Sequence, residues 1–275
     1  MPILEQINKS LEWADLVSPA FFILSVGAPI GFRFRRLRWA LWGVPLILAQ
    51  ATGEQAGVPI LSGLAGLAVI LGSIAVLVRG LRESRRFHAA WLKRFHAQPA
   101  VSLEAPFQGR WRALETGPSI ARNHHLAARD QWFAVDWVRI DAPSRGSAIL
   151  SPGNGVIAHV EDGHADKPSR RWLQADKANP AGNYVSLRLD GQDGQQDVFV
   201  ILAHLAQGSI VVRSGEAVQA GELLGLCGNS GNTTIPHLHI HVQPVERFAA
   251  GSIWGIPIVF GERTGWIQPR EIATA

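Results

Sequence analysis

The stretch with the clearest chemical character is Pro236–Val242, which reads P-H-L-H-I-H-V. His237, His239 and His241 alternate with apolar residues. Because side chains of a β-strand have a period of two, all three would lie on one face. Imidazole is the commonest neutral metal ligand and the usual acid or base near pH 7. The pattern therefore indicates a metal site or a catalytic site, and the alternative is a solvated face of an edge strand.

Further candidate ligands lie upstream, in the run R-N-H-H-L-A-A-R-D-Q-W-F-A-V-D-W-V at residues 122–138. Asp136 stands between a valine and a tryptophan, and a lone carboxylate in an apolar strand is costly to bury unless a metal ion or a cation pairs with it. The adjacent His124 and His125 precede it, and Asp130 is a weaker candidate in a polar loop. A solvent-facing aspartate on an edge strand remains the alternative for Asp136.

A third group is His204, which ends the apolar run F-V-I-L-A-H-L. Taken alone, such a residue is equally well explained as a structural histidine. A catalytic zinc site needs about three ligands from His, Asp and Glu, with one position left to water. The three groups together supply these ligand types. The loop C-G-N-S-G-N-T-T at 227–234 lacks the pattern of a phosphate-binding loop, which argues against nucleotide binding.

Composition points to a chain with a membrane-anchored part. Of the 275 residues 47% are apolar and 17% charged, and the net charge is +4. The arginines gather beside apolar runs, so we interpret the charge as membrane topology and not as nucleic-acid binding. Cys227 is the single cysteine, which excludes an internal disulfide and a cysteine-based zinc site.

Three apolar runs, at residues 16–32, 39–52 and 56–78, predict two to three transmembrane helices that contact the lipid bilayer. We expect a membrane anchor at residues 1–82, an interfacial helix and linker at 83–106, and a β domain at 107–275. The domain is predicted to be all-β, an antiparallel sandwich or barrel-like fold, because short β-type runs alternate with turn residues. These runs are Gly109–Leu114, Trp132–Ile140, Gly155–Val160, Asn183–Leu189, Asp197–Leu202, Ser209–Val212, Leu223–Cys227 and Leu238–Gln243.

The motifs that contain these candidate residues resemble those of a known family. The stretch G-N-S-G-N-T-T-I-P-H-L-H-I-H, the A-H-L at 203–205 and the upstream His and Asp are similar to the lysostaphin-type (LytM-like) zinc metallopeptidases, which are mostly peptidoglycan endopeptidases. The resemblance covers roughly residues 105–245. It implies that His239 and Asp136 are zinc ligands and that His237 and His204 are catalytic histidines.

Two positions depart from the family pattern. The family commonly has His-x-x-x-Asp, but Trp132 stands four residues before Asp136. The remaining ligand must then be His125 or His124, and the similarity of N-H-H…Q-W-F-A-V-D to some members favours His125. His241 stands where the family usually has glutamate, and we interpret it as lying outside the metal's own ligands.

The main hypothesis is a membrane-anchored zinc metalloendopeptidase that hydrolyses peptidoglycan cross-links or a protein substrate. The alternative is an inactive or weak domain of the same type that binds and regulates a cell-wall hydrolase. A biotinyl- or lipoyl-type carrier is rejected because the hairpin at residues 211–227 has no lysine at its tip. For a peptidoglycan substrate we expect a bacterial inner-membrane protein whose catalytic domain faces the periplasm or the exterior, although the basic clusters by themselves favour the cytoplasm.

Overall fold

The computed structural model describes residues 59–119, 123–168, 176, 178–191 and 197–274, with side chains from residue 71 onward. The chain divides into two compact units, Met1–Phe87 and His88–Ala275. In the first unit the described residues belong to helix α3 (Pro59–Phe95), whose last residues belong to the second unit. The second unit contains all the described strands.

The expected transmembrane helices are not supported. Over the part of the chain that the structure describes, no helix is both long enough and apolar enough to cross a membrane. The runs 16–32 and 39–52 lie outside the described residues. The run 56–78 overlaps α3, to which the same finding applies. The predicted transmembrane fold class is therefore wrong, and the bilayer contact that rested on it has no support.

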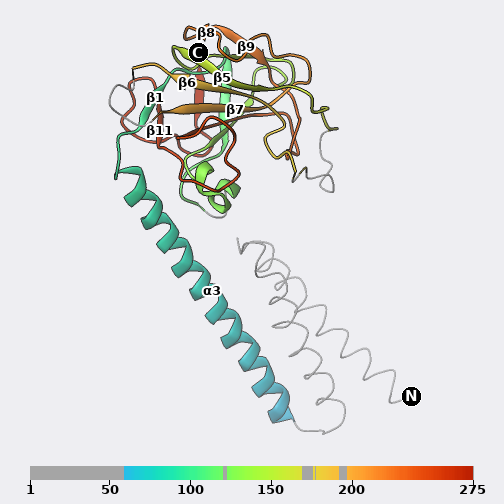
Figure 1. Ribbon diagram of the computed structural model, residues 1–275. Coiled ribbons are helices and arrows are strands. Elements are labelled where there is room, and N and C mark those ends of the chain that lie inside the picture. The colour runs from blue at the N-terminus through green and yellow to red at the C-terminus, as the bar shows by residue number, and fades with distance from the viewer. Residues whose placement is uncertain (1–58, 120–122, 169–175, 177, 192–196, 275) are drawn as a thin grey trace, which may run out of the picture. The chain divides into compact units, whose positions relative to one another are not determined.

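The second unit is mostly β, as expected for the domain after the linker. Its main sheet has eight strands in the order β12-β2-β3-β10-β7-β6-β5-β8, and every neighbouring pair is antiparallel. Figure 1 shows β5, β6 and β7 side by side in this sheet. The strands are β2 (Arg110–Glu115), β3 (Val135–Arg139), β5 (Gly155–Glu161), β6 (Asn183–Leu189), β7 (Phe199–Leu205), β8 (Ala217–Val218), β10 (Leu238–Gln243) and β12 (Ile272–Thr274).

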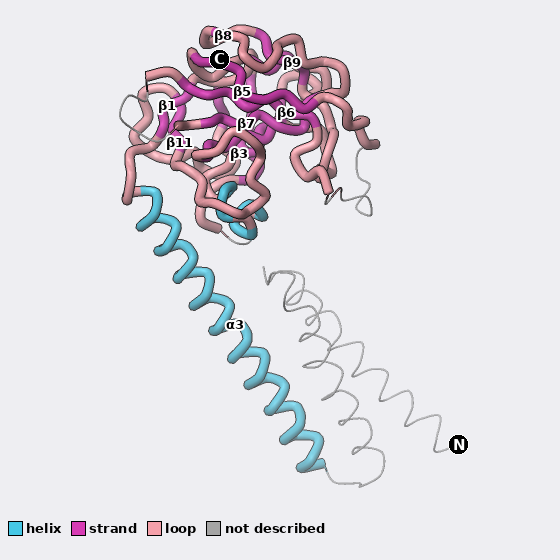
Figure 2. The backbone as a smooth tube through the Cα atoms, in the orientation of Figure 1, coloured by secondary structure: helices cyan, strands magenta, loops and turns pink. Residues whose placement is uncertain are grey.

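Smaller elements complete the unit. Strands β1 (Val101–Leu103) and β11 (Ile258–Phe260) form a parallel pair, and β4 (Ala148–Leu150) pairs with β9 (Leu223–Leu226) in antiparallel fashion. Two short 3-10 helices, η2 (His124–Ala127) and η3 (Arg129–Gln131), precede β3. Figure 2 shows how much of the unit is loop between these elements.

The alternation of residues along the central strands separates a core face from a polar face. On β10, Leu238, Ile240 and Val242 are fully buried in the main hydrophobic core. Each such side chain contributes about 1.5–3 kcal/mol by its removal from water. The intervening His239 and His241 must then point to the opposite face of the sheet. The core thus fixes which way the candidate ligands point.

Two of the expected strands need correction. Ser209–Val212 is not a strand, although the backbone N–H of Val211 still donates to the carbonyl of Leu224. Trp132–Ile140 is strand only from Val135, because η3 and a turn occupy its first residues. In both places a hydrophobic run forms a loop or a 3-10 turn and not a strand. Apolar residues that pack under a loop have no period that distinguishes them from a short strand.

Candidate metal centre

Four of the predicted site residues meet around one carboxylate. Oδ1 of Asp136 lies 2.9 Å from Nδ1 of His239 and 3.2 Å from Nε2 of His125. Oδ2 of Asp136 lies 3.5 Å from Nε2 of His237. All four side chains are buried, with at most 8% of each exposed. His204, the fifth, joins them through its ring, whose centroid is 4.7 Å from that of His237.

Strand pairing explains why residues so far apart in sequence converge. His239 on β10 lies directly opposite Asp136 on β3 and opposite Ala203 on β7. Directly opposite residues have Cβ atoms about 4.5–5.5 Å apart on the same face of a sheet. The alternation that buries Val135 and Trp137 in the core turns Asp136 to the face that carries the histidines. The ladder therefore builds the centre from three adjacent strands.

His125 reaches the same carboxylate from a different kind of element, the helix η2. Asn123 caps this helix, because its Oδ1 accepts from the backbone N–H of His125 at 3.1 Å. The Nδ2 of Asn123 donates to the carbonyl of Gly117 at 2.6 Å, which ties the cap to the chain after β2. Capping of this kind contributes about 1 kcal/mol. Asn123 thus positions a candidate ligand without contacting the centre.

An aromatic cluster supports the segment that carries His125. Leu126 and Phe133 pack with Trp91 and Phe95 from the end of α3. The rings of Trp91 and Phe95 stack with centroids 5.2 Å apart, and Nε1 of Trp91 donates to the carbonyl of Trp132 at 2.6 Å. The segment before β3 is therefore held by side-chain packing against the end of α3. Strand β10, in contrast, is held by backbone hydrogen bonds to β3 and β7 on its two edges.

The chemistry of the donor atoms fits a zinc ion. Both ring nitrogens of His125 are buried; Nε2 has only the 3.2 Å contact with Asp136, and Nδ1 has no hydrogen-bond partner among the described residues. A buried nitrogen that lacks a good hydrogen bond is costly, and ligation of a metal ion by the imidazole reduces that cost. Two imidazoles and one carboxylate are a typical zinc ligand set that leaves a fourth position for water. His125, Asp136 and His239 are the residues that would hold the ion.

His124 is the competing candidate. Ligating atoms of His124, His125 and Asp136 all lie within 4.8 Å of one another, so the structure brings both histidines to the carboxylate. However, Nδ1 of His124 lies 2.5 Å from Oε2 of Glu115, and its side chain is 62% exposed, against 1% for His125. Burial and unsatisfied nitrogens both favour His125. The choice between the two nevertheless remains a prediction.

His204 and His237 have defined tautomers, because each Nδ1 contacts a backbone carbonyl, which can only accept. Nδ1 of His204 donates to the carbonyl of Ser230 at 2.9 Å, and Nδ1 of His237 donates to that of Ile235 at 2.8 Å. Nε2 of neutral His204 is then bare and able to take a proton, whereas Nε2 of His237 faces Oδ2 of Asp136 at 3.5 Å and is placed to donate. The two histidines could therefore act as a proton acceptor and a proton donor beside the candidate ligands.

The backbone around His204 is strained in a way that is common at functional sites. His204 has φ 63°, a left-handed conformation that costs energy for a residue with a Cβ. Its N–H donates to the carbonyl of Ala181, beside a close approach of two loops. A Cβ on Gly231 (φ 79°) would lie 2.4 Å from the backbone nitrogen of Gly182. Glycine at position 231 thus permits the close approach of the loop 227–234 to the chain at Gly182.

Burial dominates the pKa values of most of these groups. It lowers the pKa of His204 to about 3, with His237 adding to the effect, and it lowers the pKa of His239 well below its usual range. Burial also opposes ionisation of Asp136, but the imidazoles of His125 and His237 outweigh it and hold that pKa well below its usual range. Burial likewise opposes the charged form of His237, but Asp136 outweighs it and raises its pKa. The centre therefore holds one carboxylate anion among mostly neutral imidazoles.

Sequence reasoning missed the residues that act through others. Glu115 binds His124 and Gln243 binds His241, yet no short-range pattern predicts either contact. A β-bulge between Ala113 and Glu115 shifts the register so that Glu115 faces Asp136. Such contacts depend on the pairing of β2 with β3, which the sequence does not display.

The part of the chain that carries β7 and β10 is similar to a known protein family. Residues 137–249 match the model of peptidase family M23. Over these residues the chain is similar to the peptidase M23 family, which confirms the predicted resemblance. The match includes His204, His237 and His239 and begins just after Asp136, so the upstream candidate ligands lie outside it.

Two curated relatives are both named uncharacterized metalloprotease. The one from Haemophilus influenzae is 32% identical over 96 residues, which is 35% of this chain and 16% of that protein. The one from Buchnera aphidicola is 32% identical over 97 residues, which is 35% of this chain and 20% of that protein. The match thus spans about a fifth of each relative or less.

Solved structures show a weaker likeness. Lysostaphin from Staphylococcus simulans is 20% identical, with 54% of this chain and 48% of that chain covered and a TM-score of 0.33. A zinc-containing peptidase from Vibrio cholerae is also 20% identical, with 60% and 41% covered and a TM-score of 0.30. Scores of this size support no statement about the site.

Proposed function

We propose that this chain is a zinc-dependent metalloendopeptidase that hydrolyses peptide bonds of peptidoglycan. The observation that carries the proposal is the convergence of His125, His237 and His239 on the buried carboxylate of Asp136, each within 3.5 Å. A neutral imidazole set around one carboxylate is the donor chemistry of a hydrolytic zinc site. The match of residues 137–249 to the model of peptidase family M23 supports the peptidase class.

Each residue has a distinct part in this proposal. A zinc ion in such a site supplies a nucleophilic water near neutral pH and polarises the scissile carbonyl. His125, Asp136 and His239 would hold the ion. His204 presents a bare Nε2 that can accept a proton, and His237, whose Nε2 faces Oδ2 of Asp136, can donate to the developing oxyanion or the leaving amine. The hydrogen bond from Nδ1 of His204 to the carbonyl of Ser230 orients its ring.

The proposed substrate also sets where the domain works. Peptidoglycan lies outside the cytoplasmic membrane, so the second unit must reach the periplasm or the cell exterior to act on it. A protein substrate is the alternative that requires no such location. Digestion of purified peptidoglycan separates the two, since a protease of proteins alone would release no new amino groups from it.

The test is a metal analysis of the purified full chain, paired with digestion of purified peptidoglycan and detection of new amino termini. The native protein is expected to hold one zinc ion per chain and to release amino groups. His239→Ala should lose both zinc and hydrolysis, and His204→Ala should keep zinc and lose hydrolysis. His88→Ala, an exposed position on α3, is the control for histidine removal.

Two outcomes would count against the proposal. Full zinc occupancy in His239→Ala would refute the ligand assignment. Zinc binding by the native protein without hydrolysis of peptidoglycan or of a protein substrate would favour the regulatory alternative, in which the domain binds a partner hydrolase.

A further inference from the structure

A chain of hydrogen bonds leads from the candidate centre along β10 to Gln243, and its donors and acceptors can be assigned from its far end. Nε2 of Gln243 lies 2.7 Å from the carbonyl of Val245 and 2.6 Å from that of Arg247. Oε1 of Gln243 lies 3.2 Å from the backbone nitrogen of Ala249. A carbonyl only accepts and a backbone N–H only donates, so these three contacts determine the orientation of the amide.

The orientation of the amide determines where His241 carries its proton. Nε2 of His241 lies 3.1 Å from Oε1 of Gln243, and because that oxygen only accepts, Nε2 must donate. His241 is fully buried, and its two polar ring contacts, Gln243 and His239, are uncharged groups. A neutral ring carries one proton, so Nδ1 of His241 is bare and accepts.

The same reasoning then applies to His239. Nε2 of His239 lies 2.9 Å from the bare Nδ1 of His241, so it must donate, and its own Nδ1 is left without a proton. This bare Nδ1 faces Oδ1 of Asp136 at 2.9 Å. Two acceptors at hydrogen-bond distance with no proton between them repel each other unless a cation lies beside both. The opposite direction of the chain would leave Nε2 of His241 and Oε1 of Gln243 as two facing acceptors instead.

We propose that Gln243 and His241 are positioning residues that hold His239 in its Nε2–H tautomer, with Nδ1 bare and directed at the metal position before any ion binds. The inference rests on the metal centre of the proposed function. It assigns a role to His241, which lies on the same strand face as the candidate ligand His239. It also assigns a role to Gln243, which takes no part in the proposed function. Hydrogen bonds of this kind fix the orientation of a ligand ring and typically change metal affinity by 10–100-fold.

The first test reads the tautomer directly, in the metal-free full chain labelled with ¹⁵N-histidine. Long-range proton–nitrogen correlations distinguish Nε2–H from Nδ1–H rings, and the signals of His239 are identified by their loss in His239→Gln. We expect His239 and His241 as Nε2–H tautomers. His204 serves as an internal contrast, because its contact with the carbonyl of Ser230 requires Nδ1–H. A His239 ring that carries its proton on Nδ1 would overturn the proposal.

The second test uses matched variants at His241 and competition with a chelator for zinc. His241→Phe keeps the ring shape and removes the acceptor, so zinc affinity should fall about 10–100-fold. His241→Glu restores an atom that can only accept, so its affinity should return close to the native value. His159→Phe, a partly buried histidine on β5 outside the hydrogen-bond chain, should leave affinity unchanged.

These outcomes separate the positioning role from the proposed function. Equal zinc affinity of His241→Phe and the native protein would refute the positioning role while leaving the metal centre intact. A native chain that binds no zinc would refute the proposed function, whereas the tautomer measurement would still report on the hydrogen-bond chain. Unfolding of His241→Phe, detected by circular dichroism, leaves the tautomer of the native protein as the deciding result.

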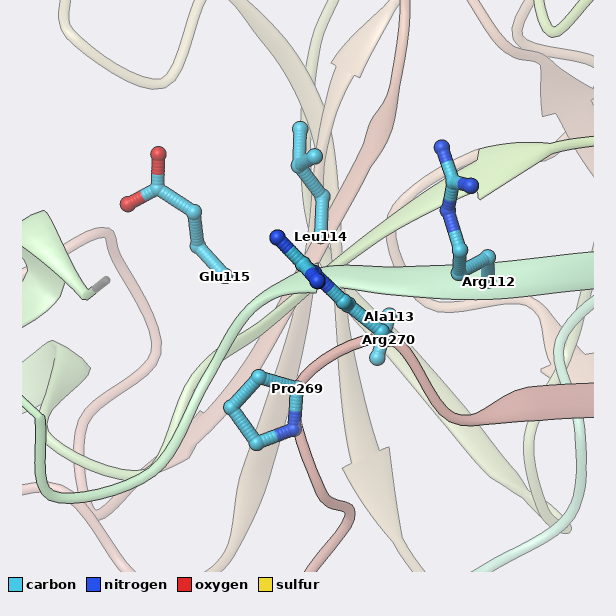
Figure 3. A pocket seen from close by; sticks show the side chains of 6 residues that line it. All are labelled: Arg112, Ala113, Leu114, Glu115, Pro269 and Arg270. Carbon is cyan, nitrogen blue, oxygen red and sulfur yellow. The ribbon is translucent and has the colours of Figure 1, made fainter.

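A second inference comes from a cavity of about 530 Å³ beside the candidate centre. Figure 3 shows its lining side chains, with that of Arg270 lying in this view between those of Arg112 and Glu115. Arg112 faces Val138 across the β2–β3 pair, and Glu115 faces Asp136. The cavity thus begins at the strand position that neighbours the metal-ligand carboxylate.

The charge of the cavity is positive. Glu115 is already paired with His124. Among the residues that the structure describes, neither Arg112 nor Arg270 makes an ion pair. Arg270 has φ 70°, a left-handed conformation held by the hydrogen bond from its N–H to the carbonyl of Ala113. Two guanidinium groups without carboxylate partners are suited to bind one carboxylate or a pair of them.

The geometry points to a carboxylate-binding subsite, in which Arg112 and Arg270 hold a free carboxylate of a peptide whose scissile bond lies at the metal centre. This inference rests on the proposed function and names the chemistry of its substrate, a peptide with an unamidated carboxyl group. The subsite acts in binding and takes no part in bond cleavage.

The test is calorimetric titration of the zinc-free full chain with a peptidoglycan stem peptide, prepared with free and with amidated carboxyl groups. The free form should bind about tenfold more tightly, as expected for charge-assisted hydrogen bonds. Combining Arg112→Gln with Arg270→Gln should remove that difference, whereas Arg213→Gln, which does not line the cavity, should keep it. Equal affinity of the native chain for both peptides would refute the subsite. Hydrolysis is not required for this readout, so a failure of the proposed activity shows up separately.

Discussion

Strand β10 and the short helix η2 both bring candidate ligands to Asp136, but they hold them by different means. His239 stands on a strand that is paired on both edges, with β3 and with β7. His125 stands on a four-residue 3-10 helix that depends on one side-chain cap and on packing beneath it. Backbone hydrogen bonds to two neighbouring strands position His239. A side-chain cap and the packing of apolar side chains position His125, and each of these contacts can be removed by a single substitution.

The sharpest way to test this comparison is to ask which histidine of η2 completes the site. His125→Ala should reduce zinc occupancy to a level that dialysis removes, because it deletes a buried ligand nitrogen with no other partner. His124→Ala should keep zinc, since that side chain is mostly exposed and bound to Glu115. Metal content after dialysis distinguishes the two, and loss of zinc in His124→Ala alone would reverse the assignment.

The next prediction concerns the packing under η2. Trp91→Ala removes a fully buried ring that stacks on Phe95 and contacts Phe133, so it should lower the free energy of unfolding by about 3–5 kcal/mol. It should also weaken zinc binding, because the segment that carries His125 loses its support. Chemical denaturation and zinc titration measure the two effects. Unchanged zinc affinity would show that η2 holds its ligand without the aromatic cluster.

A smaller effect is expected at the cap. Asn123→Ala should cost about 1 kcal/mol of stability and weaken zinc binding, because it removes the acceptor for the N–H of His125. Asn123→Ser keeps an acceptor at the cap and loses the donation to Gly117. Of the two variants, the serine should therefore lie closer to the native protein in both unfolding and zinc titration. The reverse order would indicate that the contact to Gly117 positions the helix.

The smallest response is expected from Cys227. Its thiol is fully buried, and burial raises its pKa to about 12, with nearby Asp166 adding to the effect. At pH 8 only about one thiol in ten thousand would be ionised. Iodoacetamide should therefore fail to label the native chain and should label it fully in denaturant. Rapid labelling at pH 8 without denaturant would show that the segment after β9 opens readily.

The difference between β10 and η2 also explains how far the sequence could predict the structure. The alternation in Leu238–Gln243 is a local signal, so the strand and the shared face of His237, His239 and His241 could be predicted. The choice between His124 and His125 could not, because it depends on the cap, on Glu115 and on burial beneath an aromatic cluster. Apolar runs were over-interpreted both as membrane spans and at Ser209–Val212, because apolar content alone does not say what a segment packs against.

The hydrogen-bond chain from Gln243 shows a similar limit. Gln243 shares its strand face with the histidines, so its position could be predicted from alternation. Its role depends on the loop carbonyls of Val245 and Arg247, which no periodic pattern places. Residues that act on a ligand through another residue are found only when the tertiary contacts are known.

The most direct test of the central claim is X-ray absorption at the zinc edge on the zinc-loaded full chain. We predict one zinc ion per chain with nitrogen and oxygen ligands at about 2.0–2.1 Å, two of them imidazoles and none of them sulfur. His239→Ala should abolish the signal after dialysis. A site with a sulfur ligand, with fewer than two imidazoles, or with zinc that survives in His239→Ala would contradict the proposed centre.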